Sequence, residues 1–220
     1  MDRTFDDEKH TKLKHMENVI LGLDEVSDDN NIVYGVDSFH YIFERMVNSI
    51  FGTENVTEYY PTFTWGLKYS KNKDGLSGPT IQPDTIMKEK DSERIYIIDS
   101  KFYRYGSLDL SQTNGLPEAA SIVKQIMYGS YVQSKYPNSK VFNLFILPYD
   151  SRGNNGKIIN AEESDIVYVG EVSSDWESDK TYGRIYTFLV DMRHIVKCWN
   201  RINHTDDRDK LHGQMKLLSV

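Results

Sequence analysis

Residues 82–101 read QPDTIMKEKDSERIYIIDSK, and this stretch predicts a β-hairpin. The polar residues 89–93 form its turn. The second strand contains the continuous apolar run 95–98, which is typical of a strand that is covered on both faces. This covered strand ends in Asp99 and Lys101, so charged groups are expected at the end of a buried strand.

Three charged side chains of the hairpin can meet. Asp99 and Lys101 are two residues apart, so their side chains point to the same face of the strand. Depending on the register, Asp84 lies opposite Ile98 or Asp99, and the two carboxylates can then converge. Neighbouring carboxylates repel when both are ionised, and a hard divalent cation such as Mg²⁺ removes that penalty by binding both. The hairpin therefore predicts Asp84 and Asp99 as metal ligands.

A lysine next to such a metal is restrained in charge and position. Lys101 could orient or deprotonate an attacking water, or stabilise the charge that develops on a phosphate oxygen. Metal-assisted phosphodiester hydrolysis follows as a hypothesis. The alternative is a surface ion pair at a strand end, which explains Asp99 and Lys101 but not Asp84.

The remaining elements follow from the spacing of apolar residues. Helices are predicted over 37–51, with Asp37 or Ser38 as N-cap and Gly52 as the stop, and over 118–133. Strands are predicted over 85–88, 94–101, 141–147, 166–172 and 185–190.

Three further segments have less regular patterns. Residues 59–69 are aromatic and partly alternating, which indicates a strand interrupted by Pro61, and 70–79 are expected to form a flexible loop. A helix is expected over 194–201.

Composition bounds the partners of the chain. Its 220 residues, 39% of them hydrophobic, indicate one folded domain. The net charge is −7, but residues 1–30 hold nine acids against four bases, whereas residues 61–105 hold eight bases against six acids. The overall charge therefore does not exclude nucleic acid, whose phosphates are bound by Lys and Arg.

The sequence gives no sign of export or of a membrane anchor. No apolar run is long enough for a signal peptide or a bilayer span, and Cys198, the single cysteine, cannot form an internal disulfide. We expect the cytoplasm. The six histidines show no zinc-type spacing, and one cysteine is not expected to build a structural zinc site, so a His-based nuclease is disfavoured. A P-loop is also absent, so any nucleotide motor must be another chain.

The hairpin resembles that of the PD-(D/E)xK nuclease superfamily. Residues 82–87 and 96–103 resemble the LlaJI-type restriction endonucleases, whose relatives include nuclease subunits of McrBC-like systems. That group typically has a Glu on the preceding helix and a Lys-Gln…Tyr element on the following one. This chain has Glu44 and the run 124–128, and the resemblance covers about residues 39–149.

The resemblance implies a fold and further site residues. The implied fold is α/β, a restriction-endonuclease-like core with a mixed central β-sheet flanked by helices. Glu44 is implied as a further metal ligand, directly or through water, and Gln125 as the residue that steadies the attacking water or the scissile phosphate. The alternatives are a salt bridge from Glu44 to Arg45 or another base, and a solvent-facing Gln125. Ser100 stands where relatives often have Ala, a small-for-small change.

The expected function is that of a Mg²⁺-dependent, type II restriction endonuclease acting on double-stranded DNA within a restriction-modification system. We expect an acidic extension over 1–30, the nuclease domain over 31–202 and a frayed polar tail over 203–220. One such active site cuts one strand, so a homodimer or a second restriction subunit is expected. A repair or recombination nuclease, and a non-cleaving DNA-binding or assembly subunit with the same fold, stay open as alternatives.

Overall fold

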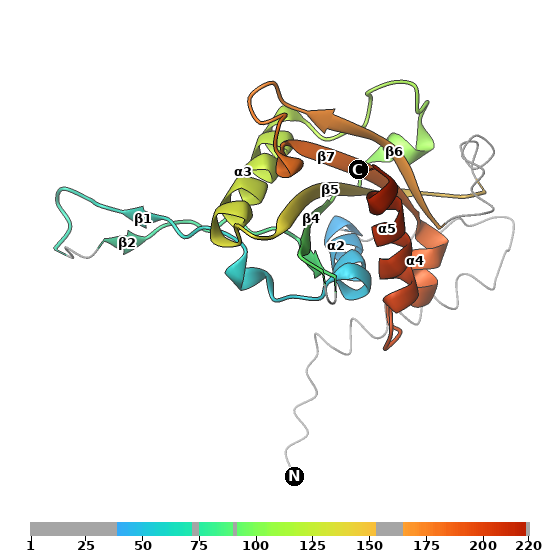
Figure 1. Ribbon diagram of the computed structural model, residues 1–220, viewed down its shortest axis with the longest axis horizontal. Coiled ribbons are helices and arrows are strands. Elements are labelled where there is room, and N and C mark those ends of the chain that lie inside the picture. Colours follow the sequence, from blue (N-terminus) through green and yellow to red (C-terminus); the bar gives the residue numbers. More distant parts are fainter. Residues whose placement is uncertain (1–38, 72–74, 90–91, 153–164, 219–220) are drawn as a thin grey trace, which may run out of the picture. The chain divides into compact units, whose positions relative to one another are not determined.

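The computed structural model describes residues 39–71, 75–89, 92–152 and 165–218 (Figure 1). All of them belong to the unit Phe39–Val220, one of the two units into which the chain divides. The predicted acidic extension over 1–30 and the predicted helix caps Asp37 and Ser38 lie outside the described residues.

A mixed five-stranded sheet forms the centre of this unit, in the order β3-β4-β5-β7-β6 (Figure 1). The middle strands β4, β5 and β7 run parallel, and β3 and β6 lie antiparallel at the two edges. The bounds are β3 (Thr85–Lys88), β4 (Arg94–Ser100), β5 (Lys140–Tyr149), β6 (Ile166–Ser173) and β7 (Arg184–Asp191). All five predicted strands of this sheet are thus confirmed, as is the α/β class.

Helices cover both faces of the sheet. One face packs against α2 (Phe39–Phe51), α4 (Met192–Cys198) and α5 (Thr205–Leu218), and the other against α3 (Ala119–Lys135) (Figure 1). Short 3-10 helices η1 (Val56–Glu58), η2 (Arg104–Ser107) and η4 (Thr181–Gly183) complete the elements with the two-residue strands β1 (Thr64–Trp65) and β2 (Leu76–Ser77). Because both faces are covered, β4 and β5 are apolar along most of their length.

The helix at the C-terminal side differs from the frayed tail expected over 203–220. Residues 205–218 form α5, and Leu211 and Met215, one helical turn apart, are fully buried in the core shared with α2. The Arg208 guanidinium donates hydrogen bonds to the carbonyls of Ile50 (2.8 Å) and Gly52 (2.9 Å), which satisfies backbone groups at the end of α2. The low apolar content of this segment did not predict a helix. A helix that buries only a narrow stripe needs few apolar residues.

The aromatic segment 59–69 also differs from its prediction. Only Thr64 and Trp65 are in strand conformation, and they pair with Ser77 and Leu76 in a separate two-stranded ribbon. Pro61 precedes the strand, and a proline cannot donate to a strand ladder. The centre of the predicted loop, residues 72–74, lies outside the described residues. Within the described ranges, every helix is too short or too polar to cross a membrane.

Candidate active site

The register of the β3–β4 hairpin places two carboxylates opposite each other. Thr85 pairs with Ile98, so the same register continued by one residue sets Asp84 opposite Asp99. The backbone N–H of Ser100 donates a hydrogen bond of 2.7 Å to Asp84 Oδ2, which fixes the Asp84 side chain against the end of β4. Of the two registers that the sequence allowed, the structure has the one that brings the two acids together.

Asp99 and Lys101 point to the face of the sheet that α3 covers. Ile95 and Ile97 of the same strand pack in the core on the α3 side, and the alternation of side chains continues to Asp99 and Lys101. Lys101 Nζ lies 2.6 Å from Asp99 Oδ2, and the Asp99 side chain is 0% exposed. The alternative of a surface ion pair does not fit a fully buried carboxylate.

Helix α3 covers the site on this face of the sheet. Lys124 Nζ lies 3.1 Å from Asp99 Oδ1, so the buried carboxylate is contacted by two lysines. Gln125 is fully buried, and its Nε2 donates a hydrogen bond of 2.7 Å to the carbonyl of Ile97. The solvent-facing alternative for Gln125 is therefore wrong. Tyr128, one turn further along α3, is fully buried as well.

Glu44 approaches the same site from α2. It is half-buried, and burial raises the pKa of its carboxyl, against the lowering effects of His40 and Lys101. Among the described residues it has no ion pair within 4.0 Å, so the structure does not support the salt bridge to Arg45. The charge of Glu44 in turn raises the pKa of Asp84, because the two carboxylates lie close enough to repel each other.

The electrostatics of the site are those of crowded acids partly neutralised by lysines. Burial, and then the charge of Asp99, raise the pKa of Asp84 to about 7, although the Ser100 N–H opposes this. Burial lowers the pKa of Lys101, but the charge and hydrogen bond of Asp99, together with the charges of Asp84 and Tyr103, outweigh it and the net shift is upward. Lys101 therefore stays protonated in this arrangement, and Asp84 gains or loses its proton near neutral pH.

The donor set suits a hard divalent cation. Asp84, Asp99 and Glu44 offer only carboxylate oxygens, the ligands that Mg²⁺ prefers. Among the described residues these three acids do not bring three ligand atoms within 4.8 Å of one another, and the two Asp99 oxygens are paired with Lys101 and Lys124. A cation bound to Asp99 would neutralise the carboxylate charge that Lys101 and Lys124 neutralise in its absence.

Two buried polar atoms next to these acids also lack a partner. The Gln125 Oε1 and the Tyr128 hydroxyl have no hydrogen bond to any described residue. Buried polar groups are nearly always hydrogen-bonded, so unsatisfied ones at a cluster of charges point to a bound water or ligand.

One residue contributes more than the sequence indicated. Lys124 belongs to the Lys-Gln…Tyr element, but its direct contact with Asp99 was not predicted. The spacing of Lys124 on α3 could have indicated this contact. Lys124 and Tyr128 are four residues apart and lie on one face of the helix. His40 lies one turn before Glu44 on α2 by the same spacing and lowers its pKa.

Comparison with known proteins agrees with this geometry. The sequence matches the model of one protein family, described as LlaJI restriction endonuclease, over residues 1–176, a range that contains every residue of the site. It is 23% identical over 201 residues to the type II restriction enzyme BsuMI component YdjA of Bacillus subtilis (strain 168), which covers 85% of this chain and 42% of the relative. The chain thus spans less than half the length of that relative. With four fifths of its length matched, the chain belongs to the LlaJI restriction endonuclease family.

Proposed function

We propose that the chain is a catalytic subunit or protomer of a type II restriction-modification system that hydrolyses phosphodiester bonds of double-stranded DNA with Mg²⁺. The observation that carries this proposal is the pairing of Asp84 with Asp99 across the hairpin, with Lys101 on Asp99, in a chain of a restriction endonuclease family. The site is that of the PD-(D/E)xK type. We place its action in the cytoplasm, where DNA is available.

Asp84, Asp99 and Glu44 are the proposed Mg²⁺ ligands. Bound there, the ion would polarise the scissile phosphate and lower the pKa of a water molecule. Lys101 Nζ lies 2.6 Å from Asp99 Oδ2, so it is placed to orient the water or take its proton, and to stabilise charge on a phosphate oxygen. Gln125 is held by its bond to the Ile97 carbonyl, so its Oε1 can accept a hydrogen bond from the attacking water.

Substitution of Asp99 tests this function directly. The purified chain with Mg²⁺ should cut unmethylated phage DNA into discrete fragments, and Asp99→Asn should abolish cutting while the circular dichroism spectrum stays unchanged. Asp175→Asn, an exposed acid outside the site, is the matched control and should cut normally. Cleavage unaffected by Asp99→Asn would overturn the site assignment.

The same assay separates the rival functions. Folded chain that cuts no DNA, with or without Mg²⁺, would favour a non-cleaving assembly subunit. A smear in place of discrete fragments would favour a repair or recombination nuclease, because discrete fragments require recognition of a sequence.

A second protomer or a partner subunit belongs to the proposal. One active site of this kind cuts one strand, and the similar protein of Bacillus subtilis is described as a component of its enzyme. At low concentration, where it is a monomer, the chain should therefore only nick a supercoiled plasmid, and the discrete fragments of phage DNA require two protomers acting together. Concentration-dependent linearisation, with a matching increase of mass in light scattering, would identify the homodimer.

A further inference from the structure

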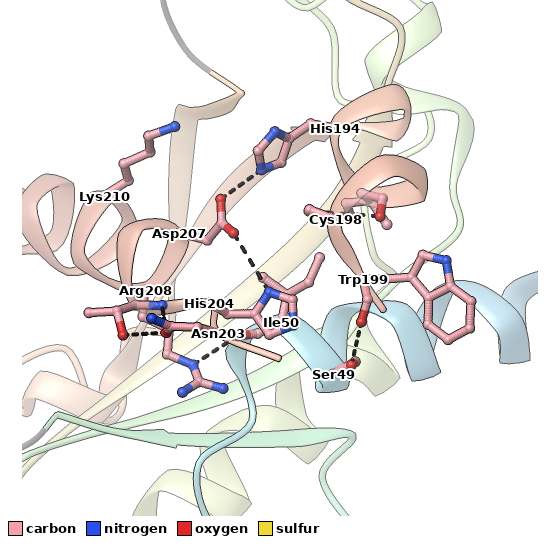
Figure 2. Close-up of polar contacts among 12 residues, drawn as sticks. Ser49, Ile50, His194, Cys198, Trp199, Asn203, His204, Asp207, Arg208 and Lys210 are labelled. Carbon is pink, nitrogen blue, oxygen red and sulfur yellow. Dashed lines mark hydrogen bonds and ion pairs between the residues drawn. The ribbon is translucent and has the colours of Figure 1, made fainter. Parts of the chain in front are cut away.

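A second cluster of potential metal ligands lies where α4 meets α5, and it shares no residue with the site described above. His194 and Cys198 are four residues apart on α4, so they lie on one face of that helix. Asp207 of α5 faces them, and one ligand atom of each of the three lies within 4.8 Å of the others (Figure 2). Cys198 and Asp207 are buried and His194 is half-buried.

The surroundings of this cluster are those of a metal site rather than of a chance contact. His194 Nε2 lies 2.6 Å from Asp207 Oδ1, while its other nitrogen, Nδ1, lies 3.2 Å from Asp165 Oδ2. A histidine that binds a metal through one nitrogen almost always donates its other ring N–H to a carboxylate or carbonyl. Asp165, at the start of β6, is in that position, and Lys210 holds Asp165 in place from 3.0 Å.

An unsatisfied histidine is the second observation. His204 is 5% exposed, and neither of its ring nitrogens has a hydrogen bond to any described residue. Its Nδ1 faces Asp207 Oδ2 at 3.8 Å, so Asp207 lies between His194 and His204 (Figure 2). A buried imidazole whose nitrogens make no hydrogen bond is costly, and a metal ion bound by Asp207 would offer it a ligand bond.

We propose that His194, Cys198 and Asp207 form a Zn²⁺ site, and that His204, whose Nδ1 lies 3.8 Å from Asp207 Oδ2, would move in as the fourth ligand when the ion binds. Nitrogen, thiolate and carboxylate ligands together are typical of zinc, whereas Mg²⁺ takes oxygen ligands only. With His204 drawn in as the fourth protein ligand, the site would be closed, which is typical of a structural zinc ion. On binding, the Cys198 thiol releases its proton to solvent and its thiolate coordinates the ion, which replaces the weak contact of Sγ with the Ile195 carbonyl.

The place of the cluster gives the ion a structural role. His194 and Cys198 come from α4, His204 from the α4–α5 connection and Asp207 from the first turn of α5. One ion bound by all four would tie α5 to α4. The sequence did not indicate this because the ligands follow the spacing H-x3-C-x5-H-x2-D, which has one cysteine and no paired motif.

Cobalt substitution tests the proposal, because the chain has a single thiol. The full chain, stripped with a chelator and titrated with Co²⁺ in excess Mg²⁺, should develop tetrahedral visible bands and a thiolate-to-cobalt charge-transfer band that saturate at one equivalent. That band can arise only from Cys198. Zn²⁺ should abolish it stoichiometrically, and excess Mg²⁺ should not. A folded chain without the charge-transfer band would overturn the proposal.

Matched variants assign the other ligands. Asp207→Asn should remove the tight Co²⁺ site, whereas Asp206→Asn, its exposed neighbour on α5, should leave it unchanged. Asp165→Asn should weaken Co²⁺ binding about 10–100-fold, as expected for a partner of a ligating histidine. Equal binding by the Asp207→Asn and Asp206→Asn variants would contradict the assignment. Zn²⁺ should also raise the melting temperature of the stripped wild type, which needs no variant to fold.

Discussion

Of the two lysines that contact Asp99, Lys101 makes the shorter contact. It touches Asp99 at 2.6 Å, and its raised pKa keeps it protonated at neutral pH in this arrangement. A second lysine, Lys124 of α3, contacts the other Asp99 oxygen. The two lysines are therefore comparable in charge but not in position, and they provide a comparison within one site.

Lys101→Met should lower the single-turnover cleavage rate by about 10²–10³-fold, because it removes a preorganised positive group at the reacting phosphate. DNA affinity in Ca²⁺ should change little. Lys124→Met is the matched comparison and should lower the rate less. Gel-based cleavage under single-turnover conditions measures both, and equal losses would mean that the lysines act only by neutralising Asp99.

Asp84 gives the metal-free protein a defined pH dependence. Its pKa is about 7 in the folded state against 3.8 for an ordinary Asp. The folded state therefore binds more protons than the unfolded state between these values, so stability should fall as pH rises from about 4 to 7 and level off above. The change attributable to Asp84 should be at most about 4 kcal/mol.

Urea unfolding in EDTA at pH 5 and pH 8, for wild type and Asp84→Asn, measures this effect. The wild type should lose more stability over this interval than the variant, which has no titrating group at this position. An identical loss in both proteins would show that other groups, such as the histidines, dominate the pH dependence.

At the scale of elements, the sequence predicted what local periodicity determines. The hairpin, α2, α3 and the three later strands of the main sheet were found because their buried faces are wide and apolar. The period of two in a strand placed Asp99 and Lys101 on one face, and the antiparallel register of the hairpin brought Asp84 opposite Asp99.

What the sequence could not give depends on contacts between distant segments. The helix α5 shows only Leu211 and Met215 as strongly apolar buried positions, and its place is set by the packing against α2 and by Arg208 at Ile50 and Gly52. The burial of Gln125 depends on how α3 sits over β4, which no spacing within α3 reveals.

The β1–β2 ribbon is the element that we expect to contact DNA outside the active site. Trp65 is 59% exposed and Tyr69 is 89% exposed, with Lys68 next to Tyr69, in a segment with more bases than acids. Exposed aromatic rings flanked by lysine can stack on bases or lie against the sugar-phosphate backbone.

Trp65→Ala should weaken DNA binding about 5–100-fold, since stacking of one base on an aromatic ring contributes about 1–3 kcal/mol. Fluorescence anisotropy with labelled duplex in Ca²⁺ measures the affinity. Trp199→Ala is the control, because Trp199 is 42% exposed and lies at the end of α4 (Figure 2). The same loss in both variants would remove the ribbon from the DNA interface.

At the scale of the whole molecule, the charge balance governs DNA affinity. The chain carries a net charge of −7, and three acids gather at the proposed cleavage site. Without a divalent ion these acids repel a phosphate, so DNA binding should be weak and strongly salt-dependent.

Ca²⁺ should strengthen DNA binding by at least about tenfold at constant ionic strength, because it neutralises the carboxylates that face the phosphate. Anisotropy titrations in EDTA and in Ca²⁺, each over a range of NaCl concentrations, measure this effect. In Asp84→Asn/Asp99→Asn the difference between EDTA and Ca²⁺ should shrink. A full Ca²⁺ effect in that double variant would place the responsible ion elsewhere.

The order of the strands also affects how the protein matures during its synthesis. The hairpin that carries Asp84 and Asp99 leaves the ribosome before β5, β7 and α5, yet β5 lies beside β4, and α5 packs against the helix of Glu44. At about 5–20 residues per second, the remaining elements follow within roughly 6 to 23 seconds. During this interval the acids lack the neighbours that bury and position them, so we expect the nascent chain to be inactive. With the proposed function, this order would keep the chain from cutting cellular DNA before α5 has been made.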